Sequence, residues 1–477
     1  MTFKRALVPL SFLLVLAGCK VGPNYTRPTV PVAPSYSEGP PKSFDGWMPG
    51  QPKDTAVRGD WWEMFGDPGL SALEVQVATA NPTVQAAEAN FRQARAQVNY
   101  NRSFLFPSFG VAPGIGRNRV SGNSPTGLQG YGYADFNVPA SVSWEPDLWG
   151  RIRRSITAAR AQYQGSAADL ANVRLELQSE LAVDYFESRS LDAQKVILDN
   201  NVTAYQKALD LTTNRFNGGV ASKAEVAQAQ TQLNQTQAQD IDVAAARAEY
   251  DHAIAILTGR LPEGFTLPPL PLNTDPPAVP VGVPSALLQR RPDIAFQERQ
   301  MAAANEQIGI ARAAYFPNLV INAEGGFEAG SIVNWFTWPS RFWALGPQAS
   351  QTIFDFGRRR AAEQSAQAGY DLTVANYRQA TLTAFQEVED NLSTLRILEQ
   401  ELAKQREATQ AAQNSAQLSI NRYKGGLVTY FEVITAQTIA LTNERTEVDL
   451  QRRRMNATVQ LIRALGGGWD RSQLPQS

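Results

Sequence analysis

The residue types that most often carry enzyme chemistry are almost missing from this chain. Its 477 residues include one histidine, His252, and one cysteine, Cys19. Metal sites draw mostly on His and Cys side chains, and a nucleophilic triad needs a histidine base. A hydrolase with two catalytic carboxylates is the main remaining possibility. The acidic pairs Glu387–Glu389 and Glu399–Glu401 lie in helical stretches, so we expect them to form solvated faces. The sequence therefore argues against an enzyme, a cofactor and a metal site.

Charge and composition exclude two further classes of protein. Lys and Arg number 44 and Asp and Glu 45, so no basic surface indicates binding to nucleic acid. Apolar residues make up 43% of the chain, which is too many for a mainly disordered protein. We expect a folded protein that does not bind nucleic acid.

The single cysteine has a specific setting near the N-terminus. A basic start is followed by the mostly apolar stretch 6–17, and Ala17-Gly18 leads directly into Cys19. This stretch is too short to span a hydrocarbon core of about 30 Å and is typical of a signal peptide. Small residues directly before a cysteine resemble the bacterial lipobox, in which the peptide is removed and the thiol is acylated. We expect an N-terminal diacylglycerol and acyl lipid on Cys19, and Lys20 in place of an Asp implies sorting to the outer membrane. An ordinary signal peptide with an incidental cysteine is the alternative.

The chain contains an internal tandem repeat. Arg215-Phe216-Asn217-Gly218-Gly219 returns 207 residues later as Arg422-Tyr423-Lys424-Gly425-Gly426, and Phe106-Pro107 returns 210 residues later as Phe316-Pro317. Repeats of this kind indicate two units of one architecture. The expected divisions are a signal peptide (1–18), a lipid-anchored extended arm (19–59), two repeats (60–263 and 284–469) and a tail (470–477).

Stretches with no Pro and little Gly predict the helices of each repeat. The predicted helices cover 83–106, 151–214 and 220–258 in the first repeat, and 293–316, 358–421 and 427–465 in the second. A Gly-Gly turn separates each long helix from the next, which predicts a long antiparallel hairpin with heptad packing. Each returning helix is predicted to begin with a capping box, Ser222 with Glu225 and Thr429 with Glu432.

The segments between the helices alternate between apolar and polar residues. Such alternation over about ten residues, with aromatics at the ends, is typical of transmembrane β-strands. Four strands are predicted, at about 108–118, 132–146, 318–328 and 342–355. Phe136, Val142, Leu319 and Ile321 would face lipid or neighbouring apolar side chains. The opposite face would line a lumen with Asp135, Asn137, Glu324 and Glu328. A soluble sheet with one buried face is the alternative for any single strand.

Several motifs together resemble one family. They are the lipobox, Asp60-Trp61-Trp62 with Phe65-Gly66-Asp67-Pro68, the two Phe-Pro steps, Arg290-Arg291-Pro292-Asp293, Arg422-Tyr423-Lys424-Gly425-Gly426 and Ala464-Leu465-Gly466-Gly467-Gly468-Trp469. They resemble the outer-membrane factors, the TolC-like channels, and among them the NodT/OprM-like efflux lipoproteins. The resemblance implies a homotrimer with a twelve-stranded barrel in the outer membrane and a long α-helical coiled-coil barrel across the periplasm. It also implies a periplasmic adaptor (membrane fusion) protein and an inner-membrane efflux pump that drive export of drugs or other small molecules.

Elementary barrel geometry agrees with three copies. Backbone groups in lipid must be paired, so a membrane sheet has to close. Four strands are too few, eight leave an interior filled by side chains, and twelve leave a lumen. A passive duct of this kind needs no catalytic residue.

The resemblance also implies a closed gate at the periplasmic tip. In the family, the helix after the second turn carries a hydrophobic ring and, one turn further on, an aspartate ring. By position these fall on Phe431 and Thr435, so the usual carboxylate is missing here. Glu432 could supply the acid, or it could only cap its helix. Arg422 and Tyr423 are expected to hold the tip shut through contacts with the neighbouring hairpin.

One alternative function needs no pore. The chain could be a lipid-anchored periplasmic coiled-coil scaffold whose alternating segments form a small soluble sheet. Extraction without detergent after removal of the lipid would favour that alternative.

Overall fold

The computed structural model describes residues 20–29, 32, 35–38, 59–123, 130–281 and 284–475. Cys19 and the predicted signal peptide lie outside these residues. The helices are η1 (Trp61–Phe65), α2 (Pro68–Ala80), α3 (Pro82–Ser103), α4 (Arg151–Asn217), α5 (Lys223–Leu257), η2 (Pro284–Ala286), α6 (Leu287–Arg290), α7 (Pro292–Ala313), η3 (Ile332–Asn334), η4 (Trp338–Ser340), α8 (Arg358–Lys424), α9 (Tyr430–Ala464) and η5 (Arg471–Gln473). The strands are β1 (Ser108–Val111), β2 (Gly114–Arg119), β3 (Gly132–Trp144), β4 (Asn318–Ala329) and β5 (Arg341–Ser350).

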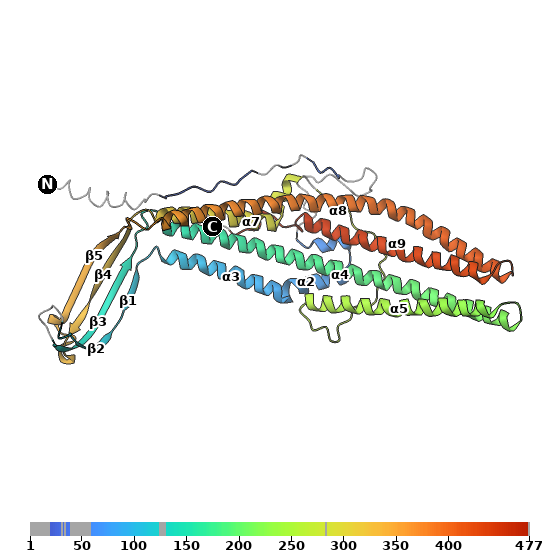
Figure 1. The fold of residues 1–477 in the computed structure, drawn as a ribbon, viewed down its shortest axis with the longest axis horizontal. Coiled ribbons are helices and arrows are strands. Elements are labelled where there is room, and N and C mark those ends of the chain that lie inside the picture. The colour runs from blue at the N-terminus through green and yellow to red at the C-terminus, as the bar shows by residue number, and fades with distance from the viewer. Residues whose placement is uncertain are drawn as a thin grey trace.

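Two long helical hairpins, α4–α5 and α8–α9, lie side by side and end in turns at the same end of the molecule (Figure 1). α4 and α8 are each 67 residues long, so each extends about 100 Å at 1.5 Å per residue. Both run three residues further than predicted, because the helix continues up to the Gly-Gly turn. None of the helices in the described part of the chain combines the length and apolar character needed to cross a membrane.

Capping residues determine where several of these helices begin and end. Pro68 and Pro82 begin α2 and α3 behind Asp67 and Asn81, whose side chains accept hydrogen bonds from the first backbone N–H groups. At the end of α4, Gly219 adopts a φ of +78°, a left-handed conformation that suits glycine. The predicted capping box of α5, Ser222 with Glu225, is present and fixes the start of the returning helix.

The strands form one antiparallel sheet that projects from the other end of the hairpins (Figure 1). β3 lies in the middle, with β1 and β2 on one side and β4 then β5 on the other. The single strand predicted at 108–118 is interrupted, because Ala112-Pro113 separates β1 from β2 and proline has no backbone N–H. Both pieces keep the same register on β3, with Val111 opposite Ala140 and Gly114 opposite Asn137.

The predicted fourth strand, 342–355, is too long at its end. β5 stops at Ser350, and residues 351–357 form an irregular link to α8. Asp355 in this link accepts hydrogen bonds from the backbone of Gly357 and Arg359, which begins the helix. β5 is shorter than predicted because Asp355, expected in the strand, instead caps the start of α8.

The main core lies midway along the hairpins and contains buried side chains of η1, α2, α4, α5, α8 and α9 (Figure 1). It includes the side chains of Trp62, Leu70, Tyr185 and Leu461. Glu74 of α2 is also completely buried, and neither carboxylate oxygen has a hydrogen-bond partner among the described residues. Burial raises the pKa of Glu74 well above its usual range, so it folds as the neutral acid.

Glu74 should make the stability of the protein depend on pH. Between a pH of about 4.5 and the raised pKa of the folded state, the unfolded chain ionises Glu74 while the folded chain keeps it protonated, so the free energy of unfolding falls by about 1.4 kcal/mol per pH unit across that window. Replacement by glutamine (Glu74→Gln) should remove this fall and raise the melting temperature most at pH 8. Thermal unfolding at pH 5 and pH 8 measures it. An equal pH dependence in the variant and the natural protein would contradict the assignment.

Candidate functional site

Tyr423, at the end of α8, joins the two hairpin tips within one chain. Its side chain is 2% exposed, and its hydroxyl lies 3.2 Å from Glu225 Oε2 and 3.3 Å from Thr212 Oγ1, both in the first hairpin. Glu225 also belongs to the capping box of α5, so the same carboxylate caps its own helix and bonds to Tyr423 of the other hairpin. The geometry is that of a polar lock between the tips.

Arg215 strengthens the contact from the first hairpin. Its guanidinium donates to the backbone carbonyl of Tyr423 at 2.7 Å and lies over the Tyr423 ring at 4.6 Å. The ring of Tyr430 packs against the other side, at 5.3 Å between centroids. The repeat counterpart of Tyr423 is Phe216, which is 41% exposed and has no hydroxyl. The lock is therefore asymmetric between the two hairpins.

Arg422 and Glu432 form a separate pair within the second hairpin. The Arg422 guanidinium lies 3.6 Å from the Glu432 carboxylate. The Arg422 side chain is 56% exposed and that of Glu432 is 50% exposed, so salt screens the pair strongly. The predicted capping box at Thr429 is wrong, because the Thr429 side chain makes no capping hydrogen bond. The Glu432 carboxylate, the other half of the expected box, pairs with Arg422 across the turn. Among the described residues of one chain, Arg422 has no hydrogen bond or ion pair with the first hairpin.

Phe431 and Thr435 lie on an exposed face of α9. The Phe431 ring is 65% exposed, next to the fully buried Tyr430 and Val433. The Thr435 hydroxyl is also exposed and bonds to the carbonyl oxygen of Phe431 at 2.9 Å. An exposed phenyl ring beside a buried tip is available to a second copy of the chain or to a lumen.

The sheet has one polar and one apolar face, as the alternation predicts. Directly paired residues share a face in an antiparallel sheet. Asn137 pairs with Glu328 and Ser141 with Glu324, so all four predicted lumen residues lie on one face. The Asn137 amide donates to Asp135 at 2.9 Å on that face. On the other face Phe136 packs against Trp335 of the loop after β4.

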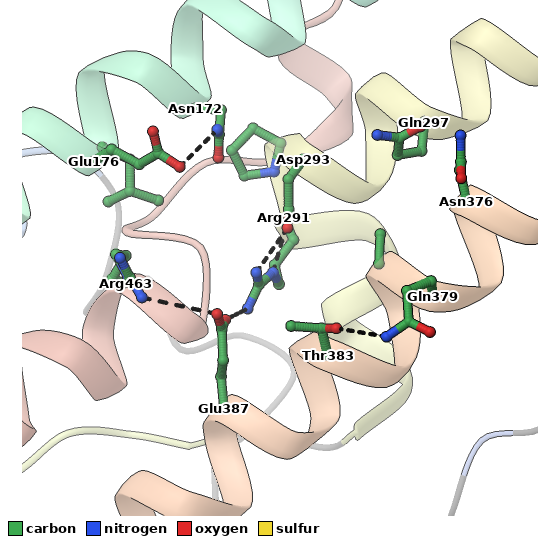
Figure 2. A pocket seen from close by; sticks show the side chains of 13 residues that line it. Asn172, Glu176, Arg291, Asp293, Gln297, Asn376, Gln379, Thr383, Glu387 and Arg463 are labelled. Atoms are coloured by element: carbon green, nitrogen blue, oxygen red, sulfur yellow. Dashed lines mark hydrogen bonds and ion pairs between the residues drawn. The ribbon is translucent and has the colours of Figure 1, made fainter. Parts of the chain in front are cut away.

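Arg291 joins the start of α7 to the middle of α8 and the end of α9 (Figure 2). It bonds Asp293 at 2.7 Å and Glu387 at 2.6 Å, and it donates to the carbonyl of Ala464 at 3.1 Å. Burial alone would lower the pKa of Arg291, but the bonds to Asp293 and Glu387 outweigh it and raise that pKa. Arg463 reaches the same Glu387 at 3.8 Å.

The predicted solvated face at Glu387–Glu389 is therefore wrong in part. Glu387 pairs with Arg291, and Glu389 accepts hydrogen bonds from the backbone of Ser37 and Glu38 in the N-terminal arm. The pocket beside Arg291, of about 380 Å³, is lined mostly by polar side chains that bond one another (Figure 2). This network holds helices together and offers no activated nucleophile. His252 is exposed on α5, away from it.

A second buried ion pair fixes the first described residues. Arg154 of α4 is fully buried and bonds Glu306 of α7 at 2.8 Å. Its guanidinium also donates to the carbonyls of Val21 and Pro23, and Lys20 lies 3.4 Å from Glu306. The backbone N–H of Val21 donates to the Trp149 carbonyl, close to the end of β3. The segment that follows Cys19 is thus held at the junction of sheet and helices.

Sequence reasoning missed several of these residues. Thr212, Arg215 and Tyr430 complete the lock, and Arg154 and Glu306 hold the arm. One signal was available for Arg215, since it is the repeat counterpart of Arg422. The others carry no local pattern, because their partners lie up to 211 residues away in the sequence.

Comparisons with known proteins agree over nearly the whole chain. Residues 74–260 and 283–467 match the family model described as outer membrane efflux protein. TtgC of Pseudomonas putida, named a probable efflux pump outer membrane protein, is 31% identical over 95% of this chain and 94% of its own. SrpC of Pseudomonas putida, named a solvent efflux pump outer membrane protein, is 31% identical over 99% of this chain and 100% of its own. The solved outer-membrane channel OprN matches with a TM-score of 0.86 and 28% identity, covering 94% of this chain and 100% of that one.

Proposed function

This chain belongs to the outer membrane efflux protein family, and from that membership we propose that three copies form the passive exit duct of a tripartite efflux system. It is an outer-membrane efflux channel that extends into the periplasm, and it is not an enzyme. The proposal concerns how the channel assembles, what lines it, what drives it and how it closes.

The open edges of the sheet support assembly from several copies. The outer edges of β1–β2 and of β5 have no strand partner among the described residues, and unpaired edges are not stable in lipid. Because β1 and β2 are two pieces of one interrupted strand, each copy contributes four strands. Pairing β5 of one copy with β1–β2 of the next closes a twelve-stranded barrel with three copies, which is wide enough for a lumen. The equal lengths of α4 and α8, and of α5 and α9, support an internal repeat and a helical barrel of matching halves.

Energy must come from partners, since a duct without catalytic groups is passive. We propose an inner-membrane pump and a periplasmic adaptor that engages the hairpin tips. Relatives about 31% identical are named for antibiotics, toluene and solvents, and one 27% identical is named for cations, which supports small apolar or amphipathic molecules as the main cargo. A scaffold without a pore would leave the apolar face and both edges of the sheet without a role.

The polar face of the sheet should give the pore a mild cation preference. Asp135, Glu324 and Glu328 place three carboxylates per chain on the proposed lumen wall, and charged rings of this kind select cations. Neutralising all three (Asp135→Asn, Glu324→Gln and Glu328→Gln) should abolish the preference in planar bilayers and leave the pore open. An anion-selective natural pore, or crosslinked assemblies that stop at dimers, would contradict the proposal.

We also propose that Cys19 carries the lipid. The docking of residues 20–23 on Arg154 supports this, because it places the segment after Cys19 beside the base of the sheet, where a membrane surface would lie. Mass spectrometry of the mature N-terminus should find a diacylated or triacylated Cys19. An unmodified Cys19, or cleavage at another residue, would refute it.

A further inference from the structure

The basic side chains of the sheet all lie at its loop end. The strands contain three of them, Arg117 and Arg119 in β2 and Arg341 in β5. This end is the one furthest from the helices (Figure 1). Because the helices extend into the periplasm, the loop end faces the outer leaflet of the membrane in the proposed barrel.

All three arginines lie on the apolar face. Arg117 pairs with Ala134 and Arg119 with Gly132, in the same alternation as Ile115 with Phe136. Arg341 pairs with Phe327, whose ring packs on Phe336. The arginines therefore lie on the face that meets lipid, opposite the carboxylates of the proposed lumen.

Arg117 and Arg119 have no acidic partner, whereas Arg341 lines a pocket that also contains Asp135 and Glu328, without an ion pair to either among the described residues. Arg117 and Arg119 are exposed and make no ion pair with any residue that the structure describes. The sequence has no Asp or Glu between residues 117 and 134, or between 329 and 341. The apolar face of the strands has none either, so a neighbouring copy could not supply one from its own strands.

Exposed aromatic rings lie next to Arg341. Trp338 is 75% exposed and Trp343 is 82% exposed. Arg341 lies over the Trp338 ring and donates from Nε to the Trp338 carbonyl at 3.1 Å. Amphipathic rings of this kind lie at the level of lipid headgroups.

We propose that Arg341 of one copy and Arg117 and Arg119 of the next bind the phosphate groups of an anionic glycolipid in the outer leaflet, because the pairing of β5 with β1–β2 in the proposed barrel brings these two edges of the sheet together. Guanidinium groups bind phosphate through two parallel hydrogen bonds, and the aromatic rings next to them contact the first carbons of the acyl chains. The inference rests on the proposed barrel, because it uses the apolar face as the lipid-facing one. It assigns a lipid-binding role to residues that conduction does not need.

Native mass spectrometry of the detergent-solubilised full-length protein tests this. Titration with diphosphorylated lipid A should show saturable binding, and Arg117→Gln/Arg119→Gln/Arg341→Gln should weaken it by about tenfold or more. Dephosphorylated lipid A should bind the natural protein as weakly as the phosphorylated lipid binds the variant. Free inorganic phosphate should not compete at equal concentration.

A matched control removes three exposed lysines from the helices, Lys207→Gln/Lys223→Gln/Lys404→Gln, and should bind lipid A like the natural protein. Equal binding by the natural protein and the arginine variant, or equal binding of the dephosphorylated lipid, would overturn the proposal. Conductance in planar bilayers distinguishes failure of the lipid site from failure of the proposed barrel. A conducting trimer without phosphate-dependent binding refutes only the lipid site, whereas loss of the trimeric pore in the natural protein refutes the proposed barrel.

Discussion

Replacing Phe431 by alanine should raise the single-channel conductance of the isolated protein severalfold. The ring is 65% exposed on α9, one residue from the buried Tyr430, so it points away from the packed tip. Three such rings in a trimer would form an apolar constriction, and apolar constrictions close pores by excluding water. The repeat counterpart of Phe431 is Ala224, so the first hairpin contributes no equivalent ring.

The control for Phe431→Ala is Leu418→Ala, which removes an exposed apolar side chain of α8 and should leave conductance near its natural value. A second variant, Tyr423→Phe, tests the lock without touching the constriction. It removes two hydrogen bonds to the first hairpin, each worth about 1 kcal/mol, and should increase the fraction of time in the open state. Unchanged conductance in Phe431→Ala would place the gate elsewhere.

Removing the Glu306 carboxylate should destabilise the protein by about 3–5 kcal/mol, because it leaves the fully buried Arg154 without its partner. The same change should release the N-terminal arm, since Arg154 holds the carbonyls of Val21 and Pro23 only while its own position is fixed. Glu306→Ala is therefore expected to lower the melting temperature and to expose residues 20–29 to limited proteolysis.

Two comparisons make the Glu306 result specific. Glu363→Ala removes the partner of Arg312 in a more exposed pair of the same region and should cost no more than about 1 kcal/mol. The double variant Arg154→Met/Glu306→Leu should recover much of the lost stability, because no unpaired charge remains buried. Proteolysis of the arm should still be faster in the double variant than in the natural protein, because Arg154 no longer holds the carbonyls of Val21 and Pro23. Full stability of Glu306→Ala would contradict the buried-pair argument.

The helices and strands could be predicted from the sequence because their signals are local. Long stretches with no Pro and a single Gly predict α4 and α8 to within three residues at their ends. Alternation of apolar and polar residues predicts which face of the sheet holds Asp135 and Glu328, since successive side chains in a strand point to opposite faces. Pro113 was visible in the sequence, and its missing N–H explains the break that the predicted strand ignored.

The contacts of the site could be predicted less well. Thr429-x-x-Glu432 fits the capping-box pattern, yet Glu432 pairs with Arg422 instead. The pattern favours a cap, but an oppositely charged side chain across the turn competes for the same carboxylate. Glu387 was expected in water and pairs with Arg291, whose position depends on how α7 meets α8.

By itself the sequence determined the family, the two repeats it predicts, the lengths of the helices and the two faces of the sheet, because periodicity, turn residues and motifs are properties of neighbouring residues. Only the tertiary structure decided that Tyr423 bonds Glu225, that Arg154 holds the arm through Glu306 and that Glu74 is buried without a partner. These side chains meet partners far along the chain. Their bonds and charge states depend on the distance and burial that packing imposes, which local sequence does not specify.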